Sequence, residues 1–195
     1  NTTRNPAKII NKSKKITFLK KQIDRLKKTR NINDIIIACS TNPKDKNIIK
    51  LCKKKKIKFY IGSEFNVLER YYKAAKKYNA KNILRITSDC PLVDPKIIDD
   101  LIYKFIINKV DYASNIIEPT FPDGFDVEIF NFKLLRNRYL KSINVNEIEH
   151  VKPGMRDSSK YKLNSMKMKK NFSKLRLTID TIEDLKIVKK LFKYF

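Results

Sequence analysis

Two stretches of the sequence place an aspartate just beyond an apolar run, at the point where a β-strand would end. In RITSDCPLVDP, residues 85–95, Asp89 follows such a run, and the two prolines beyond it force an extended, rigid loop. In LRLTIDTIEDL, residues 175–185, Asp180 follows the run 175–179. Hard cations prefer oxygen ligands, and Mg²⁺ is typically held by one or two carboxylates plus substrate phosphates. If both runs belong to one sheet, Asp89 and Asp180 are candidates to share one Mg²⁺.

The aspartates in these stretches also have a purely structural explanation, because Asp is a preferred N-cap of helices. Asp94 directly precedes Pro95, which favours a cap at the start of the helix that follows. For Asp180 the spacing alone favours a cap over a ligand, and Thr181 is the alternative cap. Asp89 stands too far before Pro95 to cap that helix, so it is the stronger functional candidate.

Hydrophobic periodicity predicts the elements that position these aspartates. Apolar runs predict strands at 34–39, 57–61 and 82–87, each followed by an amphipathic helix. This β-α order implies an α/β fold with a mostly parallel, doubly wound sheet and right-handed crossovers. Ligands bind such sheets beyond the carboxyl ends of the strands, so the loops after Ser40, Ile61 and Ser88 are expected to carry the function.

The rhythm of the elements changes after residue 112. Short strands are predicted at 126–130, 160–164 and 175–179, followed by a final helix over 182–192. We interpret these strands as a small β flap added to the main sheet. With 195 residues and no internal linker, the chain is expected to form a single domain over 1–195.

The composition argues against several classes of protein. A net charge of +25 invites a nucleic-acid-binding function, but only 9 of the 45 basic residues are Arg, the preferred residue for bidentate phosphate contacts. The 36 Lys, 27 Ile and 18 Asn, together with only 3 Gly, fit an A/T-rich codon bias instead. No apolar run reaches the roughly 20 residues of a membrane helix. The three cysteines form no CxxC pair, which favours a reducing cytoplasm over a disulfide framework or a zinc site.

The strings RITSDCPLVDPKIID, DYASN, FPDGFDVEIF, EHV and LRLTIDTIEDL occur in this order over nearly the whole chain. In this respect the sequence resembles the cytidylyltransferases that make CMP-activated acidic sugars, and most of all the spore coat polysaccharide biosynthesis protein F-like branch. The resemblance implies a cytoplasmic enzyme of surface polysaccharide biosynthesis with a Rossmann-like nucleotidyltransferase fold. It would transfer CMP from CTP to an acidic or related sugar and release pyrophosphate. The resemblance also makes Asp89 and Asp180 the ligands of the Mg²⁺ cofactor, and it is compatible with a homodimer.

The same resemblance assigns further residues to the site. The N-terminal segment TTRNPAK, residues 2–8, resembles the tail of a phosphate-binding loop in which Arg4 and Lys8 are the two catalytic cations. Fixed positive groups there would stabilise the charge on departing pyrophosphate. The family's first strand would precede this loop, so we expect the chain to be truncated at its N-terminus, and relatives usually continue past the final helix. Ser88 is then expected beside the nucleotide, and the sugar is expected to contact the following residues: Asp123, Asp126, Glu128 and His150.

Two rival functions stay open at this point. A metal-dependent glycosyltransferase also uses a nucleotide-binding α/β sheet, but it is expected to show an Asp-x-Asp triplet, whereas Cys-Pro follows Asp89. A nucleic-acid-binding module would gather Lys and Arg on one face among aromatic residues. Here the lysines are predicted on the outer faces of nearly every helix, which disfavours that function.

Overall fold

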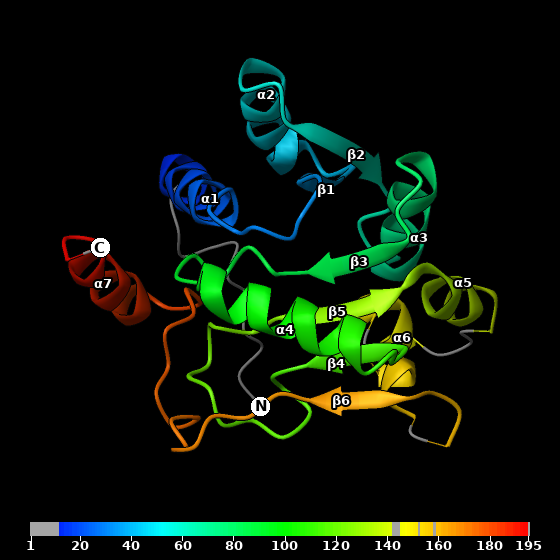
Figure 1. Cartoon of the computed structure of the whole chain (residues 1–195). Helices are drawn as coiled ribbons and strands as arrows, with labels where there is room; N and C mark the ends of the chain where they lie inside the picture. The colour runs from blue at the N-terminus through cyan, green and yellow to red at the C-terminus, as the bar shows by residue number, and fades with distance from the viewer. Residues whose placement is uncertain (1–11, 142–144, 152, 158, 195) are drawn as a thin grey trace.

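The computed structural model describes residues 12–141, 145–151, 153–157 and 159–194. Helices and strands alternate through the first two thirds of the chain (Figure 1). The helices are α1 (Lys12–Leu26), α2 (Lys46–Lys54), α3 (Val67–Lys77), α4 (Pro95–Ile107), α5 (Phe132–Lys141), α6 (Val145–His150) and α7 (Ile182–Leu191), with 3-10 turns η2 (Pro43–Asp45) and η3 (Pro153–Arg156). The strands are β1 (Ile36–Ser40), β2 (Lys58–Gly62), β3 (Asn82–Arg85), β4 (Tyr112–Ser114), β5 (Glu128–Asn131) and β6 (Leu163–Ser165).

The strands of the described chain form two sheets. β1 and β2 pair in parallel, and a four-stranded sheet has the order β3-β5-β4-β6. In the larger sheet β4 and β6 are parallel, whereas β5 runs antiparallel to both of its neighbours. Figure 1 places the two-stranded sheet above the larger one, with α4 crossing in front of β5 and β4.

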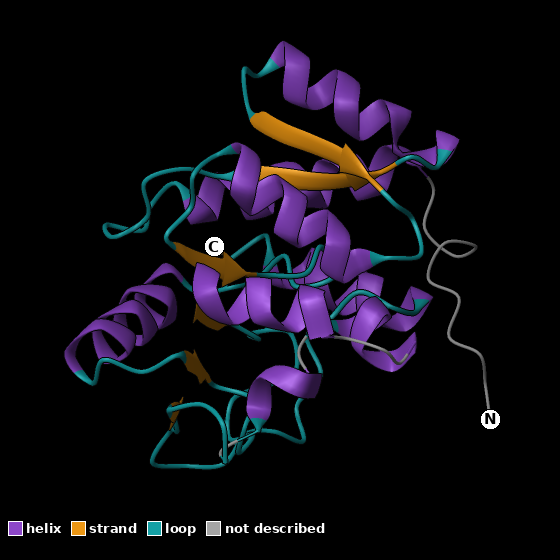
Figure 2. Cartoon of the chain, turned by 90° about the vertical axis from the view of Figure 1, so that its right-hand side faces the viewer, coloured by secondary structure: helices purple, strands orange, loops and turns teal. Residues whose placement is uncertain are grey.

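Helices cover both faces of the four-stranded sheet because its strands carry apolar residues on alternate faces. On one face Ala113 and Ile129 pack against Ile98, Leu101 and Phe105 of α4. On the other face Tyr112 and Phe130 pack against residues of α3, α5 and η3, namely Leu68, Ala75, Leu134, Leu135 and Met155. Figure 2 shows the strands between these helices. The predicted α/β class, with parallel strand pairs flanked by helices, is confirmed.

The predicted β flap is wrong in two respects. β5 is a central strand of the larger sheet, because it pairs with β3 on one edge and with β4 on the other, and Glu128, Ile129 and Phe130 are all buried. The predicted strand 175–179 is an extended segment whose only ladder contact is an isolated parallel bridge between Asp123 and Arg176. The other predicted strands occur within a few residues of their predicted positions, and β4 was not predicted.

A third apolar cluster joins the two ends of the described chain. Phe18 of α1 packs with Leu92, Ile179, Leu185 and Val188, and its ring lies 5.9 Å from that of Phe192. This cluster fixes α1 and α7 beside the loop that follows β3.

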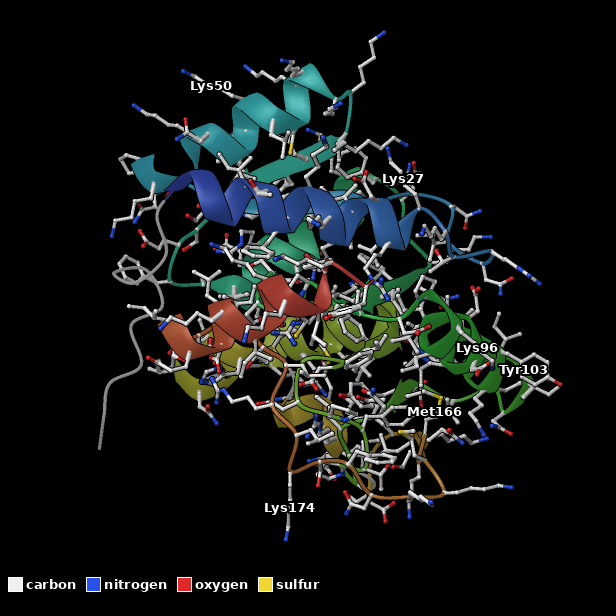
Figure 3. All side chains as sticks on the ribbon, turned by 90° about the vertical axis from the view of Figure 1, so that its left-hand side faces the viewer. Lys27, Lys50, Lys96, Tyr103, Met166 and Lys174 are labelled. Carbon is white, nitrogen blue, oxygen red and sulfur yellow. The ribbon has the colours of Figure 1, made fainter. Side chains whose placement is uncertain are left out.

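Lysines lie on the outside of several elements, as predicted from the sequence. Lys27, Lys50, Lys96 and Lys174 are exposed and extend away from four different parts of the molecule (Figure 3). Within the described residues no helix is long and apolar enough to cross a bilayer. All three cysteines are buried and free.

Candidate functional site

Side chains of α1 donate hydrogen bonds to the loop after β3 and hold it in place. Asp89 lies in a turn that is closed by a hydrogen bond from the Cys90 amide to the Thr87 carbonyl. Gln22, which is 4% exposed, donates its side-chain amide to the carbonyls of Thr87 and Cys90, at 2.8 and 2.9 Å. Arg25 donates to the carbonyl of Val93 at 2.8 Å. These bonds span Asp89 on both sides and therefore fix the backbone from which its carboxylate projects.

The segment that precedes Asp180 lies along the same loop. The amide of Ile179 donates to the carbonyl of Asp89 at 2.9 Å, so two residues 90 positions apart in sequence become neighbours in space. Gly124 lets the segment that contains Leu177 come close to its own loop. Its φ is +109°, and a side chain at this position would meet the backbone of Leu177 at 2.6 Å. Burial and the negative charge of Asp89 both raise the pKa of Asp180. The expected meeting of Asp89 and Asp180 is present in the structure.

The helix caps are now assigned. Thr181 caps α7 in a capping box with Asp184, so Asp180 lies before the cap and the interpretation of Asp180 as the cap is wrong. Asp94 caps α4 by accepting a hydrogen bond from the Lys96 amide at 2.7 Å, as predicted. Burial alone would raise the pKa of Asp184, but hydrogen bonds from the backbone of Asp180 and Thr181, with the charge of Arg176, lower it.

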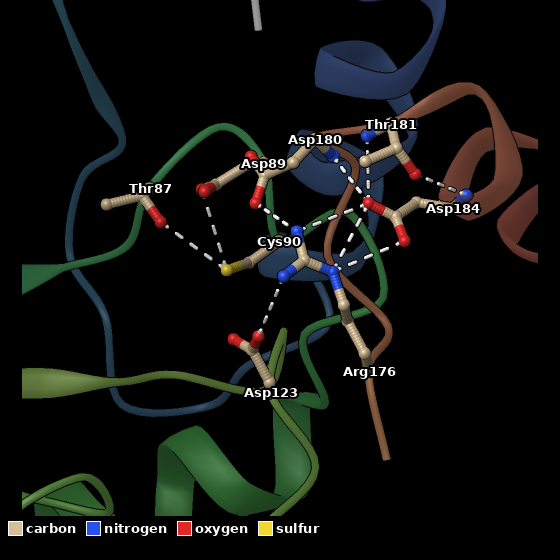
Figure 4. A network of polar contacts seen from close by, with 8 residues as sticks. All are labelled: Thr87, Asp89, Cys90, Asp123, Arg176, Asp180, Thr181 and Asp184. Carbon is tan, nitrogen blue, oxygen red and sulfur yellow. Dashed lines mark hydrogen bonds and ion pairs between the residues drawn. The ribbon is translucent and has the colours of Figure 1, made fainter. Parts of the chain in front are cut away.

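Arg176 connects the acidic residues of this region (Figure 4). Its Nη2 lies 2.5 Å from Oδ2 of Asp180, and its Nε lies 3.3 Å from both carboxylate oxygens of Asp184. Its Nη1 lies 4.0 Å from Oδ2 of Asp123. We call Arg176 with Asp123, Asp180 and Asp184 the acidic cluster, because it contains one positive and three negative side chains.

The donors of this region fit a hard divalent cation that shares its shell with water and substrate. Asp89 and Asp180 supply carboxylate oxygens close enough for one charge to act on the other. The described residues contain no group of three or more His, Cys, Asp or Glu side chains that could hold a metal ion by themselves. Two carboxylates suffice for Mg²⁺, which keeps several waters and binds substrate phosphates.

The neighbouring predicted residues lie on the same side of the molecule. Ser88 is exposed in the turn beside Asp89. Asp123 and Asp126 are half-buried, and both charges act on the thiol of Cys90. Burial is the first cause that raises the pKa of that thiol, followed by Asp89. Asp123 and Asp126 therefore border the site of Asp89 and Asp180.

Glu128 belongs to a different group of charges. Its Oε1 lies 3.3 Å from Nη1 of Arg85 and 3.9 Å from Nη2 of Arg156, and its side chain is 2% exposed. Arg156 also donates to the hydroxyl of Tyr112 at 3.2 Å. Burial, followed by the charge of Glu128, raises the pKa of Tyr112 to about 12. We call Arg85, Glu128 and Arg156 the basic cluster, because two positive side chains face one negative one.

Two members of the basic cluster, Arg85 and Glu128, lie in one row of the larger sheet. Arg85 pairs with Glu128 across β3 and β5, Ser114 pairs with Glu128, and Ser165 pairs with Ser114. Residues that lie directly opposite one another share a face of the sheet, so this polar row borders the apolar row that contains Tyr112 and Phe130. Burial lowers the pKa of Arg85, but nearby groups, among them Tyr71, Glu128 and Asp89, raise it above its ordinary value. Asp89 is therefore close enough to the basic cluster for its charge to act on Arg85.

The remaining predicted residues are not brought into these clusters. His150 is exposed at the end of α6. Arg4 and Lys8 lie outside the described residues. Conversely, the sequence patterns missed Gln22, Arg85, Arg156 and Arg176. The available signal was an arginine inside an apolar run, as in ILRIT and LRLTI, in a chain where most basic residues are Lys.

The sequence profile of the cytidylyltransferase family matches residues 1–192. The chain belongs to the cytidylyltransferase family. Among the relatives of this cytidylyltransferase, an uncharacterized protein of Methanocaldococcus jannaschii is 34% identical over 178 residues, 89% of this chain and 71% of that protein. Spore coat polysaccharide biosynthesis protein SpsF of Bacillus subtilis is 28% identical over 165 residues, 83% of this chain and 68% of SpsF. The predicted family and its SpsF-like branch are confirmed.

Solved structures agree with this assignment. A cytidylyltransferase of Leptospira borgpetersenii superposes with a TM-score of 0.87 at 32% identity, covering 91% of this chain and 76% of that one. A CMP:2-keto-3-deoxy-manno-octonic acid synthetase complexed with CTP gives a TM-score of 0.67 at 9% identity, covering 91% and 88% of the two chains. At that identity the second likeness shows the fold alone. The cytidylyltransferase therefore has the Rossmann-like nucleotidyltransferase fold that was predicted.

Proposed function

We propose that this cytidylyltransferase transfers CMP from CTP to an acidic or related sugar and releases pyrophosphate, in the synthesis of a surface polysaccharide. The observation that carries the proposal is the meeting of Asp89 and Asp180 beside the loop after β3, in a chain of this family. The names of two similar proteins support its finer parts. One is a CMP-sugar synthetase complexed with CTP, and the other is a spore coat polysaccharide biosynthesis protein.

In this proposal Asp89 and Asp180 hold one Mg²⁺, which supplies charge neutralisation at the transferring phosphoryl group. Gln22 fixes the backbone on both sides of Asp89, so that carboxylate need not be reorganised when the nucleotide binds. Ser88 lies beside Asp89, and its exposed hydroxyl is available to the nucleotide. Arg4 and Lys8 keep their predicted role at the departing pyrophosphate.

The sugar is proposed to bind on the side of Asp123 and Asp126, which border Asp89 and whose carboxylates are acceptors for hydroxyl groups. Glu128 is buried and paired with Arg85, so its contribution is to hold the two arginines of the basic cluster next to this side. Two arginines against one glutamate leave a positive charge, which suits the carboxylate of an acidic sugar. His150 stays a predicted sugar contact.

The test is an assay of pyrophosphate release by the protein as its gene encodes it. We expect release with CTP, Mg²⁺ and one member of a panel of acidic sugars, and no release with UTP, ATP or GTP. Neutral sugars of the same size serve as the matched control for the acidic group. Turnover with UTP in place of CTP, or activity that persists in the presence of EDTA, would contradict the proposal. Asp94→Asn is the control variant, because Asn caps α4 as well as Asp does.

A further inference from the structure

Arg176 places a positive charge beside the carboxylate of Asp180, which would otherwise lack a counter-charge among the described side chains. The proposed Mg²⁺ would compete with Arg176 for that carboxylate. Nη2 of Arg176 lies 2.5 Å from Oδ2 of Asp180, one of the two proposed metal ligands. The same guanidinium is anchored to Asp184 through both Nε and Nη2, each at 3.3 Å. Asp184 itself is fixed by hydrogen bonds from the amides of Asp180 and Thr181, at 3.0 and 2.8 Å. Arg176 therefore has one anchor that belongs to the helix cap and one contact that belongs to the metal site.

A metal ion could take the place of Arg176 at Asp180 but not at Asp184. Asp184 is 7% exposed, and its carboxylate is engaged by the start of α7 whether or not a metal is bound. The side chain of Asp180 has no role in that cap; its carboxylate contacts Arg176 and is close enough to Asp89 to feel its charge. A divalent cation between Asp89 and Asp180 would supply the charge that Arg176 now supplies. Two cations on one carboxylate repel each other, and the one with a second anchor can withdraw at small cost.

We propose that Arg176 is a tethered counter-cation that holds Asp180 in the metal-free protein and releases it when Mg²⁺ binds. The inference rests on the proposed metal site of Asp89 and Asp180. Asp184 keeps the guanidinium in place after the release. Nη2 also lies 3.3 Å from Oδ2 of Asp184, so after the release it stays beside the metal site, where a planar guanidinium would suit the phosphate oxygens that Mg²⁺ brings with it. Arg176 thus sets the metal affinity and couples metal binding to binding of the anion.

The first test measures binding of MgCl₂ and MnCl₂ by titration calorimetry to the metal-free protein, without nucleotide. In Arg176→Met the competing charge is absent, so we expect both metals to bind about tenfold more tightly than to the unchanged protein. The metal-free variant should unfold at a lower temperature, and added metal should raise that temperature by more than in the unchanged protein. Lys96→Met is the matched control. It too removes one positive charge, in this case from an ion pair at the surface.

A purely structural role of Arg176 makes the opposite prediction. In that case Arg176→Met would lower the unfolding temperature and leave metal affinity unchanged or weaker, and this result would overturn the inference. Failure of the proposed function looks different. The unchanged protein would then bind no metal, or Asp89→Asn and Asp180→Asn would leave metal binding unaltered.

A second measurement uses the unchanged protein, so it does not require that Arg176→Met folds. In the unchanged protein, the side-chain ¹⁵N signals of Arg176 report whether its Nη groups are held. We expect the Nη2 signal to shift after MgCl₂ is added, because Nη2 loses its contact with Asp180 and keeps the one with Asp184. The Nε signal should stay in place, because its partner Asp184 is unchanged. Signals of Nη2 that do not respond to a saturating metal concentration would overturn the proposed release.

Discussion

The acidic cluster and the basic cluster contain the same kinds of side chain in opposite proportions. In the acidic cluster one arginine faces Asp123, Asp180 and Asp184, and Asp89 lies beside them. In the basic cluster one glutamate faces Arg85 and Arg156. The side chain of Glu128 is 2% exposed, whereas that of Asp123 is 45% exposed. The acidic cluster is the more open group and has negative charge in excess, whereas the basic cluster is more buried and has positive charge in excess.

This difference indicates what each cluster is suited to do. An open group with surplus negative charge can recruit a hydrated cation at modest cost, because neither partner must lose all of its water. A buried group with surplus positive charge favours an anionic partner, and its ion pairs are costly to break singly. Asp89, which lies beside the acidic cluster, is close enough to the basic cluster for its charge to act on Arg85. Together the two clusters fit a substrate that brings a metal-bound phosphate to one side and a second anionic group to the other.

The largest effect is expected from the two proposed metal ligands. Asp89→Asn and Asp180→Asn should each lower kcat about a thousandfold, because several kcal/mol of charge stabilisation are lost at about 1.4 kcal/mol per tenfold. Thermal unfolding and circular dichroism should show an intact fold. Asp94→Asn, in the same loop, should leave kcat unchanged. Near-normal turnover in either ligand variant would remove that residue from the site.

A substitution in the basic cluster should chiefly lower the stability of the fold. Glu128→Gln leaves Arg85 and Arg156 without their counter-charge in a buried place, and we expect a loss of about 3 kcal/mol in the free energy of unfolding. Glu118→Gln is the matched control, since Glu118 pairs with Lys167 at the surface and such pairs contribute about 0–1 kcal/mol. Urea denaturation of both variants measures the difference. Equal losses would show that burial does not distinguish the two pairs.

The acidic cluster contains one carboxylate whose role is structural and depends on pH. Asp184→Ala removes half of the capping box of α7, and we expect a loss of about 1 kcal/mol at neutral pH. The native pKa of Asp184 lies below its ordinary value of 3.8. The contribution of Asp184 is therefore present above about pH 4 and is lost as the pH falls through the native pKa.

Urea denaturation at several pH values checks this expectation. The gap between the unchanged protein and Asp184→Ala should shrink below about pH 4. Glu183→Ala, an exposed change in the same first turn, should show no such trend. A gap that grows on acidification would reverse the sign assigned to the Asp184 pKa.

The smallest effect concerns the lysines that belong to neither cluster. If the net charge of +25 reflects composition, DNA binding should be weak, independent of sequence and largely lost between roughly 50 and 200 mM salt. Fluorescence anisotropy with two unrelated duplexes measures this. Tight binding that distinguishes the duplexes at physiological salt would favour a nucleic-acid function for the lysine faces over a compositional origin.

Local signals in the sequence determined much of the molecule. The α/β alternation follows from periodicity, and the cap at Asp94 follows from an acceptor placed directly before Pro95. The motif strings identified the family, and two aspartates beyond apolar runs pointed to the site. These features depend on residues within one or two turns of each other, so a single sequence suffices to recognise them.

Only the tertiary structure decided the pairing of strands and the partners of charges. β5 looked like a flap because its short run carries no sign of which strands will flank it, yet both of its faces are buried. The position of Asp180 beside Asp89 depended on how the preceding segment docks, through the bond from the Ile179 amide to the Asp89 carbonyl. Arg85, Arg156 and Arg176 each find acids or aromatic groups that are distant in sequence or on another element. Such partners depend on long-range packing, which no local pattern of residue types encodes.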